Sequence, residues 1–481
     1  MLAILAFRNL VVKKGRSVLL LLGYGLGVGV MIVLLSVGEA MVEQSSDVSL
    51  VGGGELTVLP QGIDIEAMRT GGVSGMFFSI GRARFLTRQL LGGPRQSGMV
   101  RAVSPVIENK LVYLRHADEV VAARAGGEIP SRATAVGAGL RVLQGEWRDG
   151  PGDTAWIAPS AEQLYDELDR FHLPAVTDSS WAEWHYFNLS SSPGEWWYIT
   201  YLVGGEVPSG RWGGKLLVSH RRPDGSYQQY SAAVPADSVV LDTTRADLTL
   251  GRNTVRQRDG VYHLVARASG PAGLFHAELD LRPDPSRYFP PVDLKEGEYL
   301  SGYVVPVLSG RAAGTICVAG DCRQVNSAPA YHDHNWGVWR DVTWDWGAAR
   351  GKEFNLLYGA VYAPTDTLFT GRAGSPRIFV ALVDSLGVRQ ILRAREVRYT
   401  GFHRDSGRHG VRAPGAFEFV AAREQDTLHV KASILDFHAT ASAAAGRQFL
   451  QMRGSFTVLG RIGGRAVSDS GTGFFETYVT E

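Results

Sequence analysis

The residues best suited to chemistry lie in one short run, residues 331–337, which holds two histidines, a carboxylate, an amide, a phenol and an indole. Successive side chains of an extended strand point to opposite faces. If this run is a strand, Tyr331, Asp333 and Asn335 share one face, which we call the acid face. It would present a carboxyl group held by two polar neighbours.

The opposite face would carry His332, His334 and Trp336, and we call it the histidine face. A His-x-His pair can bind a metal ion, but a third ligand would have to come from a distant part of the chain. The distant candidates are His185, His220, Glu183 and Glu195. No spacing in the sequence supports any of them, so we expect packing histidines, with no metal and no other cofactor.

The acid face suits proton transfer to carbon. Hydration of an unactivated alkene starts with protonation of carbon, so the acid must stay protonated near neutral pH, which burial of a carboxyl group achieves. We identify Asp333 as the candidate acid, with Tyr331 and Asn335 orienting its carboxyl group. The alternative is a structural carboxylate that holds a strand end or pairs with Arg340, and the sequence leaves both interpretations open.

Aromatic residues are concentrated in the middle of the chain, where all 11 tryptophans lie between Trp147 and Trp346. Such residues either fill a core or line a pocket for an apolar ligand, and their π-faces can stabilise a transient cation. We expect Trp197 or Trp336 in that last role. The expected contacts of a lipid-like or isoprenoid ligand are Trp196, Trp197, Tyr198, His334, Asn335 and Trp336.

The elements that must position these residues are short alternating strands, which begin near residue 176. Residues 261–268 and 274–282, for example, flank a Gly-Pro-Ala-Gly turn that indicates a hairpin. Many such strands over roughly 300 residues favour antiparallel barrels. The fold class we expect is mainly β, with two tandem lipocalin-sized barrels over residues 176–340 and 341–481.

Cys317 and Cys322 are the two cysteines of the chain, and a two-residue turn between them would place them opposite each other in a hairpin. A disulfide is the expected outcome. A Cys-x4-Cys zinc half-site is the alternative, although it lacks a second cysteine pair.

The first part of the chain has the pattern of a membrane anchor. Residues 17–38 contain no charge until Glu39, basic residues precede them, and acidic residues follow. This predicts a transmembrane helix with its N-terminus in the cytoplasm; a cleaved signal peptide is the alternative. Glycines 23, 25, 27 and 29 form two overlapping Gly-x-x-x-Gly pairs, which favour packing against partner helices.

The remaining predicted segments are a cytoplasmic basic segment at residues 1–16, a small extracytoplasmic α+β domain at 39–148, and a linker with a short helix at 149–175. The net charge is +1, with 49 basic and 48 acidic residues, so no strong field favours a nucleic-acid partner.

Residues 5–10, 14–17 and 34–39, and more weakly 104–107 and 135–139, resemble the first transmembrane segment and the extracytoplasmic domain of ABC-transporter permeases of the MacB/FtsX type. Downstream of residue 38 the sequence has no second apolar run long enough to span a bilayer. The resemblance therefore implies a partner of ABC permease and ATPase subunits in a bacterial inner membrane, with most of the chain in the periplasm.

A second resemblance covers residues 176–481. Glu195-Trp196-Trp197-Tyr198, the run 331–337 and Gly473-Phe474-Phe475-Glu476 resemble the AttH-like and carotenoid 1,2-hydratase (hydroxyneurosporene synthase) family. That resemblance implies two tandem lipocalin-like barrels. It also implies, at Asp333 and Tyr331, the acid site of members that hydrate a C=C bond without a cofactor.

Together these observations predict a membrane-anchored, extracytoplasmic, lipocalin-like protein that binds a lipid or isoprenoid and works with an ABC-type export system. The alternative is a cofactor-independent hydratase or lyase acting on an isoprenoid C=C bond. A purely structural assembly factor is a third possibility.

Overall fold

The computed structural model of the chain divides into two units, residues 1–87 with 100–157, and residues 88–99 with 158–481. It describes residues 14–46, 56, 58, 80–116, 119–136, 148–153, 169–172, 180–296, 299–338, 343–362, 378–404, 411–441 and 447–480.

The N-terminal part contains helix α2 (Lys14–Ser46), where the sequence predicts a transmembrane segment. Among the described residues, no helix combines the length and the apolar character needed to cross a membrane. Further along, the chain forms α4 (Ile80–Gly92), the antiparallel pair β1 (Val106–His116) and β2 (Glu119–Glu128), α5 (Pro130–Ala135) and the short helix η1 (Pro151–Asp153).

Eight antiparallel strands close on themselves to form barrel 1, because β14 pairs with β3 and β10 pairs with both β6 and β11. They are β3 (Trp181–Ser192), β4 (Glu195–Glu206), β5 (Arg211–Arg221), β6 (Tyr227–Pro235), β10 (Val261–Gly270), β11 (Gly273–Pro283), β13 (Tyr299–Val318) and β14 (Asp321–Val338). Three strands continue the sheet from β10, and a fourth pairs with β13: β7 (Val239–Leu241), β8 (Leu248–Leu250), β9 (Asn253–Arg258) and β12 (Phe289–Glu296). The short helices η2 (Val207–Ser209) and η3 (Ala236–Ser238) connect strands.

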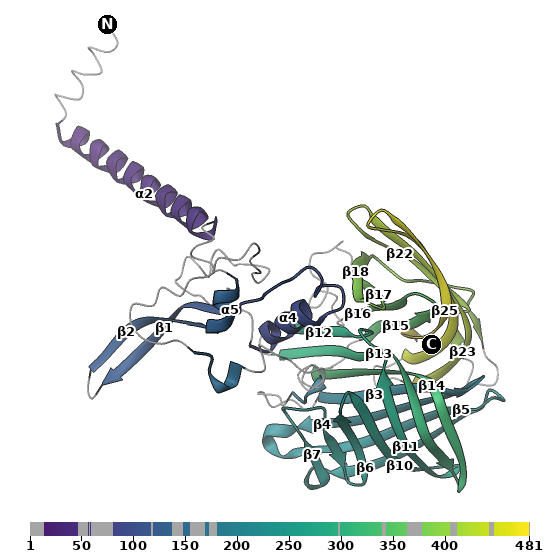
Figure 1. Cartoon of the computed structure of the whole chain (residues 1–481). Helices are drawn as coiled ribbons and strands as arrows, with labels where there is room; N and C mark the ends of the chain where they lie inside the picture. The colour runs from purple at the N-terminus through teal and green to yellow at the C-terminus, as the bar shows by residue number, and fades with distance from the viewer. Residues whose placement is uncertain are drawn as a thin grey trace. The chain divides into compact units, whose positions relative to one another are not determined.

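A second ring of eight antiparallel strands forms barrel 2, closed by the pairing of β18 with β22 (Figure 1). Its strands are β15 (Thr343–Gly351), β16 (Asn355–Tyr362), β17 (Ile378–Asp384), β18 (Gly387–Ala394), β22 (Ala416–Arg423), β23 (Asp426–Ala441), β24 (Arg447–Ile462) and β25 (Arg465–Thr480). Three short strands accompany them: β19 (Arg398–Thr400), β20 (His403–Arg404) and β21 (Arg412–Ala413). The predicted fold class, two tandem antiparallel barrels, is confirmed.

Alternation along the strands separates three cores. Phe187, Trp197 and Tyr201 belong to the core inside barrel 1, and Tyr358 and Phe475 belong to the core inside barrel 2. A third core lies where the outer faces of the two barrels meet. It includes Tyr186, Tyr198, Tyr331, Trp346 and Phe474. Burial of each large side chain stabilises the fold by about 1.5–3 kcal/mol, so the third core holds the two barrels together.

The hairpin between β13 and β14 turns at Ala319 and Gly320, both with positive φ, 51° and 89°. Two such residues make the two-residue turn whose twist matches paired strands. Cys317 and Cys322 face each other in the register and are joined by a disulfide. A zinc half-site at these cysteines is therefore excluded.

Candidate functional site

The acid face forms as the alternation predicts, and it belongs to the core between the barrels. The Tyr331 hydroxyl donates to Oδ2 of Asp333 at 2.8 Å, and the Asn335 amide donates to Oδ1 at 2.7 Å. Nε1 of Trp346, from barrel 2, donates to the Tyr331 hydroxyl at 3.1 Å. Both oxygens of the Asp333 carboxyl group are therefore held in place, and one of the supporting side chains is tied to the second barrel.

Trp346 reaches Tyr331 because the neighbouring strand leaves room for its ring. Gly359 is paired with Trp346 in the register of β15 and β16. A Cβ atom at Gly359 would collide with the Trp346 indole. The glycine is thus a local requirement of the acid face, although it lies in the other barrel.

Glu476 of β25 is a second buried carboxyl group at this interface. Nε1 of Trp344 donates to its Oε2 at 3.1 Å, and Nε2 of Gln451 donates to its Oε1 at 3.2 Å. The same Gln451 nitrogen lies 3.3 Å from the Tyr186 hydroxyl of barrel 1. Two carboxyl groups from different barrels therefore occur within one aromatic layer.

Burial raises the pKa of Asp333 well above its ordinary range; the Tyr331 hydrogen bond opposes this shift and the Glu476 charge adds to it. Burial likewise raises the pKa of Glu476, against the hydrogen bonds from Trp344 and Gln451. Burial and the nearby Asp333 charge raise the pKa of Tyr331 well above its ordinary value. Burial therefore shifts all three groups toward their neutral, protonated forms.

Arg340, the sequence-based alternative partner of Asp333, lies outside the described residues. Within the described part of the chain, the hydrogen-bond partners of Asp333 are the two neutral side chains Tyr331 and Asn335.

The aromatic residues predicted to bind a ligand are divided between two faces of β4. Trp196 and Tyr198 face barrel 2, where the Arg453 guanidinium lies 3.1 Å from the Trp196 ring centre and donates from Nε to the Tyr198 hydroxyl at 3.1 Å. Trp197 points into barrel 1 and stacks on His220, with ring centres 3.5 Å apart. The structure does not bring these three side chains to one site.

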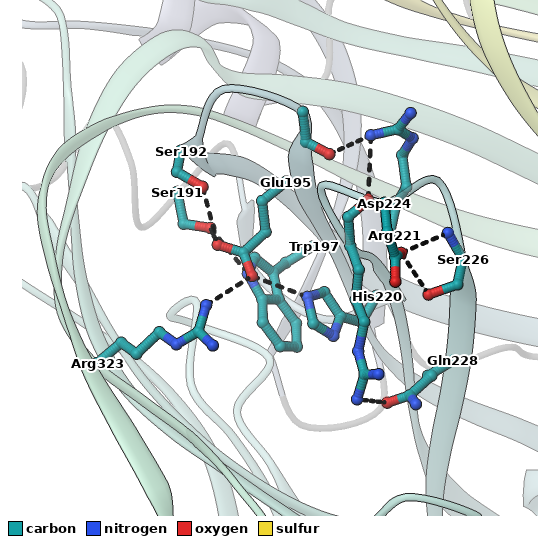
Figure 2. Close-up of polar contacts among 12 residues, drawn as sticks. Ser191, Ser192, Glu195, Trp197, His220, Arg221, Asp224, Ser226, Gln228 and Arg323 are labelled. Atoms are coloured by element: carbon teal, nitrogen blue, oxygen red, sulfur yellow. Dashed lines mark hydrogen bonds and ion pairs between the residues drawn. The ribbon is translucent and has the colours of Figure 1, made fainter.

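A polar network surrounds Trp197 at the start of β4 (Figure 2). The Glu195 carboxylate accepts hydrogen bonds from the hydroxyls of Ser191 at 2.7 Å and Ser192 at 3.1 Å, and it lies 3.0 Å from Nε2 of His220. Nη1 of Arg323 is 3.6 Å from the same carboxylate. The serine hydroxyls contact the carboxylate rather than the imidazole, so this arrangement does not activate a serine nucleophile.

The histidine face points into barrel 1 and is fully buried. His332 and His334 lie next to His185 of β3 and to Asp169, which precedes the barrel; all four side chains are 0% exposed. Glu183 of β3 accepts from the second nitrogen of His334, 2.8 Å away. Of the four distant residues named from the sequence, Glu183 and His185 reach the histidine face, whereas His220 and Glu195 form the separate network of Figure 2.

Trp336 shares this interior face and stacks on His172, with ring centres 3.9 Å apart. Neither Trp336 nor Trp197 therefore faces Asp333, so the expected role of these two rings in stabilising a cation at the acid face does not fit their positions. The rings of Tyr186 and Phe474 lie beside Tyr331, with centres 6.4 and 4.6 Å from the centre of its ring.

Sequence reasoning missed Asp169, His172 and Gln451. Asp169 bonds to residues more than 160 positions away, so no local spacing reveals it. A signal for Glu183 and His185 was present, because alternation along residues 181–187 places these two side chains on one strand face.

A cavity of about 440 Å³ lies at the end of barrel 2 where β15 starts and β25 ends. Its lining residues are Thr343, Trp344, Asp345, Tyr362, Tyr399, Phe402, Arg412, Thr477, Tyr478 and Val479. Trp344 both lines this cavity and donates a hydrogen bond to Glu476. The cavity therefore adjoins the layer that contains both buried carboxyl groups.

Fold and site together define a tandem pair of eight-stranded antiparallel barrels with a buried carboxyl site in the aromatic layer between them. No family model matches the sequence. No curated protein matches it either.

Several solved structures are similar to this chain. An AttH-type protein from Nitrosomonas europaea is 18% identical, with a TM-score of 0.45 over 64% of this chain and 96% of that one. Kievitone hydratase from Nectria haematococca is 13% identical, with a TM-score of 0.43 over 62% of this chain and 89% of that one. CghA is 11% identical, with a TM-score of 0.45 over 65% of this chain and 94% of that one.

Proposed function

We propose that this chain is a general-acid hydratase that adds water to a C=C bond of an apolar, isoprenoid-like substrate between its two barrels. Asp333 is the acid and Tyr331 its catalytic partner. The observation that carries the proposal is the Asp333 carboxyl group, 4% exposed, surrounded by aromatic rings and held by two neutral donors. Such surroundings keep a carboxylic acid protonated, as donation of a proton to carbon requires.

The reaction balances with the groups present. Asp333 transfers its proton to one alkene carbon, and the other carbon becomes cationic. Water attacks the cation and loses a proton to the Asp333 carboxylate, which restores the acid. The product has gained one C–H and one C–OH bond. The aromatic rings of this layer, Tyr186 and Phe474 among them, would stabilise the developing charge.

Asp333→Asn tests the role of the acid. We expect hydration of an acyclic carotenoid by the full chain in detergent, with one deuterium placed on carbon when the reaction is run in D₂O. Asp333→Asn should abolish this turnover because the amide cannot donate a proton to carbon. Asp247→Asn is the matched control, since Asp247 is a part-buried carboxylate paired with Arg258. Turnover by Asp333→Asn at the wild-type rate would remove Asp333 from the mechanism.

The second candidate function is binding of a lipid or isoprenoid without turnover, and the aromatic-lined cavity of about 440 Å³ in barrel 2 favours it. Native mass spectrometry of the full chain, followed by lipid extraction, separates the two candidates. A bound apolar molecule recovered unchanged after incubation supports binding alone. Anchoring in a bacterial inner membrane and association with ABC permease and ATPase subunits remain predictions from residues 1–145, and a pull-down from membranes tests them.

A further inference from the structure

Four fully buried side chains inside barrel 1 direct their polar atoms toward one another. Nε2 of His332 lies 2.9 Å from Oδ2 of Asp169, and Nδ1 of His334 lies 2.8 Å from Oδ1. Nδ1 of His185 lies 3.4 Å from Nε2 of His332 and 3.6 Å from Oδ2 of Asp169. Three imidazoles and a carboxylate thus surround one point that neither the acid face nor the cavity uses.

Hydrogen bonding alone explains this arrangement only if His332 and His334 each carry two protons. Nδ1 of His332 faces the Tyr186 carbonyl at 3.1 Å, and Nε2 of His334 faces Glu183 at 2.8 Å. Because carbonyls and carboxylates only accept, both outer nitrogens carry a proton. The inner nitrogens also face a carboxylate, so each of the two rings would need a second proton. If His332 and His334 are instead neutral, the inner nitrogen of each ring carries a lone pair, and both lone pairs point at the same position in the cluster.

His185 is the member that hydrogen bonds explain least. Its Nδ1 lies 3.4 Å from Nε2 of His332 but too far from Asp169 for a hydrogen bond, and its Nε2 is buried with no hydrogen-bond partner among the described residues. With the proton on Nε2, the Nδ1 lone pair points at the other inner atoms, where a cation can accept it.

We propose that Asp169, His185, His332 and His334 bind a divalent first-row transition metal, with Zn²⁺ the ion that fits best. Zinc takes four N or O ligands at about 2.0–2.1 Å in a tetrahedron, so neighbouring ligand atoms lie about 3.4 Å apart. The contacts between inner ligand atoms, 2.8–3.6 Å, span that separation. The candidate ligand atoms of Asp169, His185 and His334 all lie within 4.8 Å of one another.

The outer contacts fit a metal site as well. Ligand histidines usually donate their second N–H to a carboxylate or a backbone carbonyl, which fixes the ring and its tautomer. Glu183 does this for His334, and the Tyr186 carbonyl does it for His332. Glu183 is itself held by the backbone N–H of His172, at 2.9 and 3.0 Å from its two oxygens. The charges of Asp169 and Glu183 together balance a divalent cation.

Such a metal would be structural. It would join Asp169, which precedes the barrel in sequence, to β3 and β14 of barrel 1, and all of its ligands are inaccessible to solvent. The proposal is independent of the acid face, whose side chains leave the opposite side of β14.

Metal analysis of the full chain in detergent tests the site. After treatment with a chelator, the protein is titrated with Zn²⁺, and separately with Co²⁺, whose visible absorption reports a tetrahedral N/O shell. We expect one equivalent bound per chain and a rise in melting temperature on adding Zn²⁺. His185→Gln and His334→Gln should lose the bound equivalent, and Glu183→Gln should bind about 10–100-fold more weakly. His220→Gln, at a buried histidine outside the cluster, should bind like the wild type.

Two outcomes would overturn the proposal. One is wild-type protein that binds no stoichiometric metal and melts at the same temperature with and without Zn²⁺. This measurement needs no variant, so it decides the matter even if the ligand variants fail to fold. The other is folded His185→Gln and His334→Gln protein with unchanged stoichiometry and an unchanged Co²⁺ spectrum, which would place the metal elsewhere.

Discussion

Asp333 and Glu476 show how the same type of side chain can be given different properties by its partners. Both carboxyl groups are buried between the barrels and held by neutral donors, and burial raises both pKa values. Glu195 is also buried, but two serine hydroxyls and His220 bond to its carboxylate and lower its pKa against the effect of burial. The number and the charge of the donors decide which form is stable.

Glu476→Gln should change how stability depends on pH. The folded pKa of Glu476 lies above its ordinary value of 4.5, so its contribution to stability is fully present below pH 4.5 and is lost as pH rises through the folded pKa. Asp333 from β14 and Tyr186 from β3 face the same layer, and Asp333 contributes with the same sign. In the variant, the unfolding free energy should fall less steeply between pH 4.5 and the folded pKa of Glu476. The slopes of wild type and variant should differ there by up to about 1.4 kcal/mol per pH unit.

Urea unfolding of wild type and variant across this pH range measures the difference. Glu195→Gln is the control with opposite sign, because a lowered pKa contributes stability above the ordinary value that is lost as pH falls. Parallel curves for wild type and Glu476→Gln would show that Glu476 ionises in the folded protein as it does in the unfolded chain.

Tyr331→Phe should weaken both the fold and the acid site. The hydroxyl donates to Asp333 and accepts from Trp346, so its removal leaves a buried N–H without its partner and should cost about 1–3 kcal/mol. Chemical denaturation measures the loss, with Tyr227→Phe, whose hydroxyl contacts the half-buried Asp436, as the control. Equal stability of the Tyr331 variant and wild type would mean that this contact does not form.

The sequence was sufficient to predict the acid face but only part of the histidine face. Alternation along one strand was enough to place Tyr331, Asp333 and Asn335 together, because a strand has a strict period of two. Asp169 reaches the histidine face only once barrel 1 has closed, and Gln451 reaches Tyr186 across the interface between the barrels. Local periodicity in the sequence cannot predict such long-range contacts. The prediction that Trp196, Trp197 and Tyr198 bind one ligand together was wrong, since adjacent residues on β4 point to opposite faces.

Among the elements, the β13–β14 hairpin is the clearest case in which local sequence determines structure. Two cysteines, five positions apart on either side of a tight turn, predict both the hairpin and its disulfide. The predicted barrels depend on the same alternation repeated along each strand. The order in which the strands close could not be derived this way, because pairing between β10 and β6 or β18 and β22 rests on very few residue pairs.

Replacing both Cys317 and Cys322 with serine should lower the stability of barrel 1 modestly. The disulfide closes a very short loop, so the entropy model gives about 2 kcal/mol. Non-reducing and reducing denaturation of wild type and variant measure this cost. Reductant should destabilise the wild type to the level of the variant and leave the variant unchanged; a reductant effect on the double variant would point to a cause other than this bond.

At the scale of the whole molecule, the contacts between the barrels are polar as well as aromatic. Arg221 of barrel 1 pairs with Asp436 of barrel 2, and Arg287 donates to Asn355 at 2.7 Å. Arg453 of β24 lies over Trp196 and bonds to Tyr198. Since these contacts surround the same aromatic core that contains the acid face, coupling between the barrels and geometry of the site should change together.

Arg453→Met should uncouple the two barrels. Arg453 is 7% exposed, and the methionine would remove both the hydrogen bond to Tyr198 and the contact with the Trp196 ring. A hydrogen bond from a charged group contributes about 1.5–3 kcal/mol, so we expect a loss of about 2 kcal/mol that acts on the interface. Calorimetry should show one transition of residues 158–481 in the wild-type chain separating into two in the variant.

Arg461→Met provides the control, because Arg461 lies on the same strand with its side chain exposed and donates to the nearby Gly464 carbonyl at 3.2 Å. It should retain the wild-type transition. If Arg453→Met also unfolds in a single step at the wild-type temperature, the aromatic core alone couples the barrels. Under the proposed function, the separated transitions should be accompanied by reduced hydration, since Trp346 of barrel 2 donates to the Tyr331 hydroxyl that holds Asp333, and this contact is lost when the interface loosens.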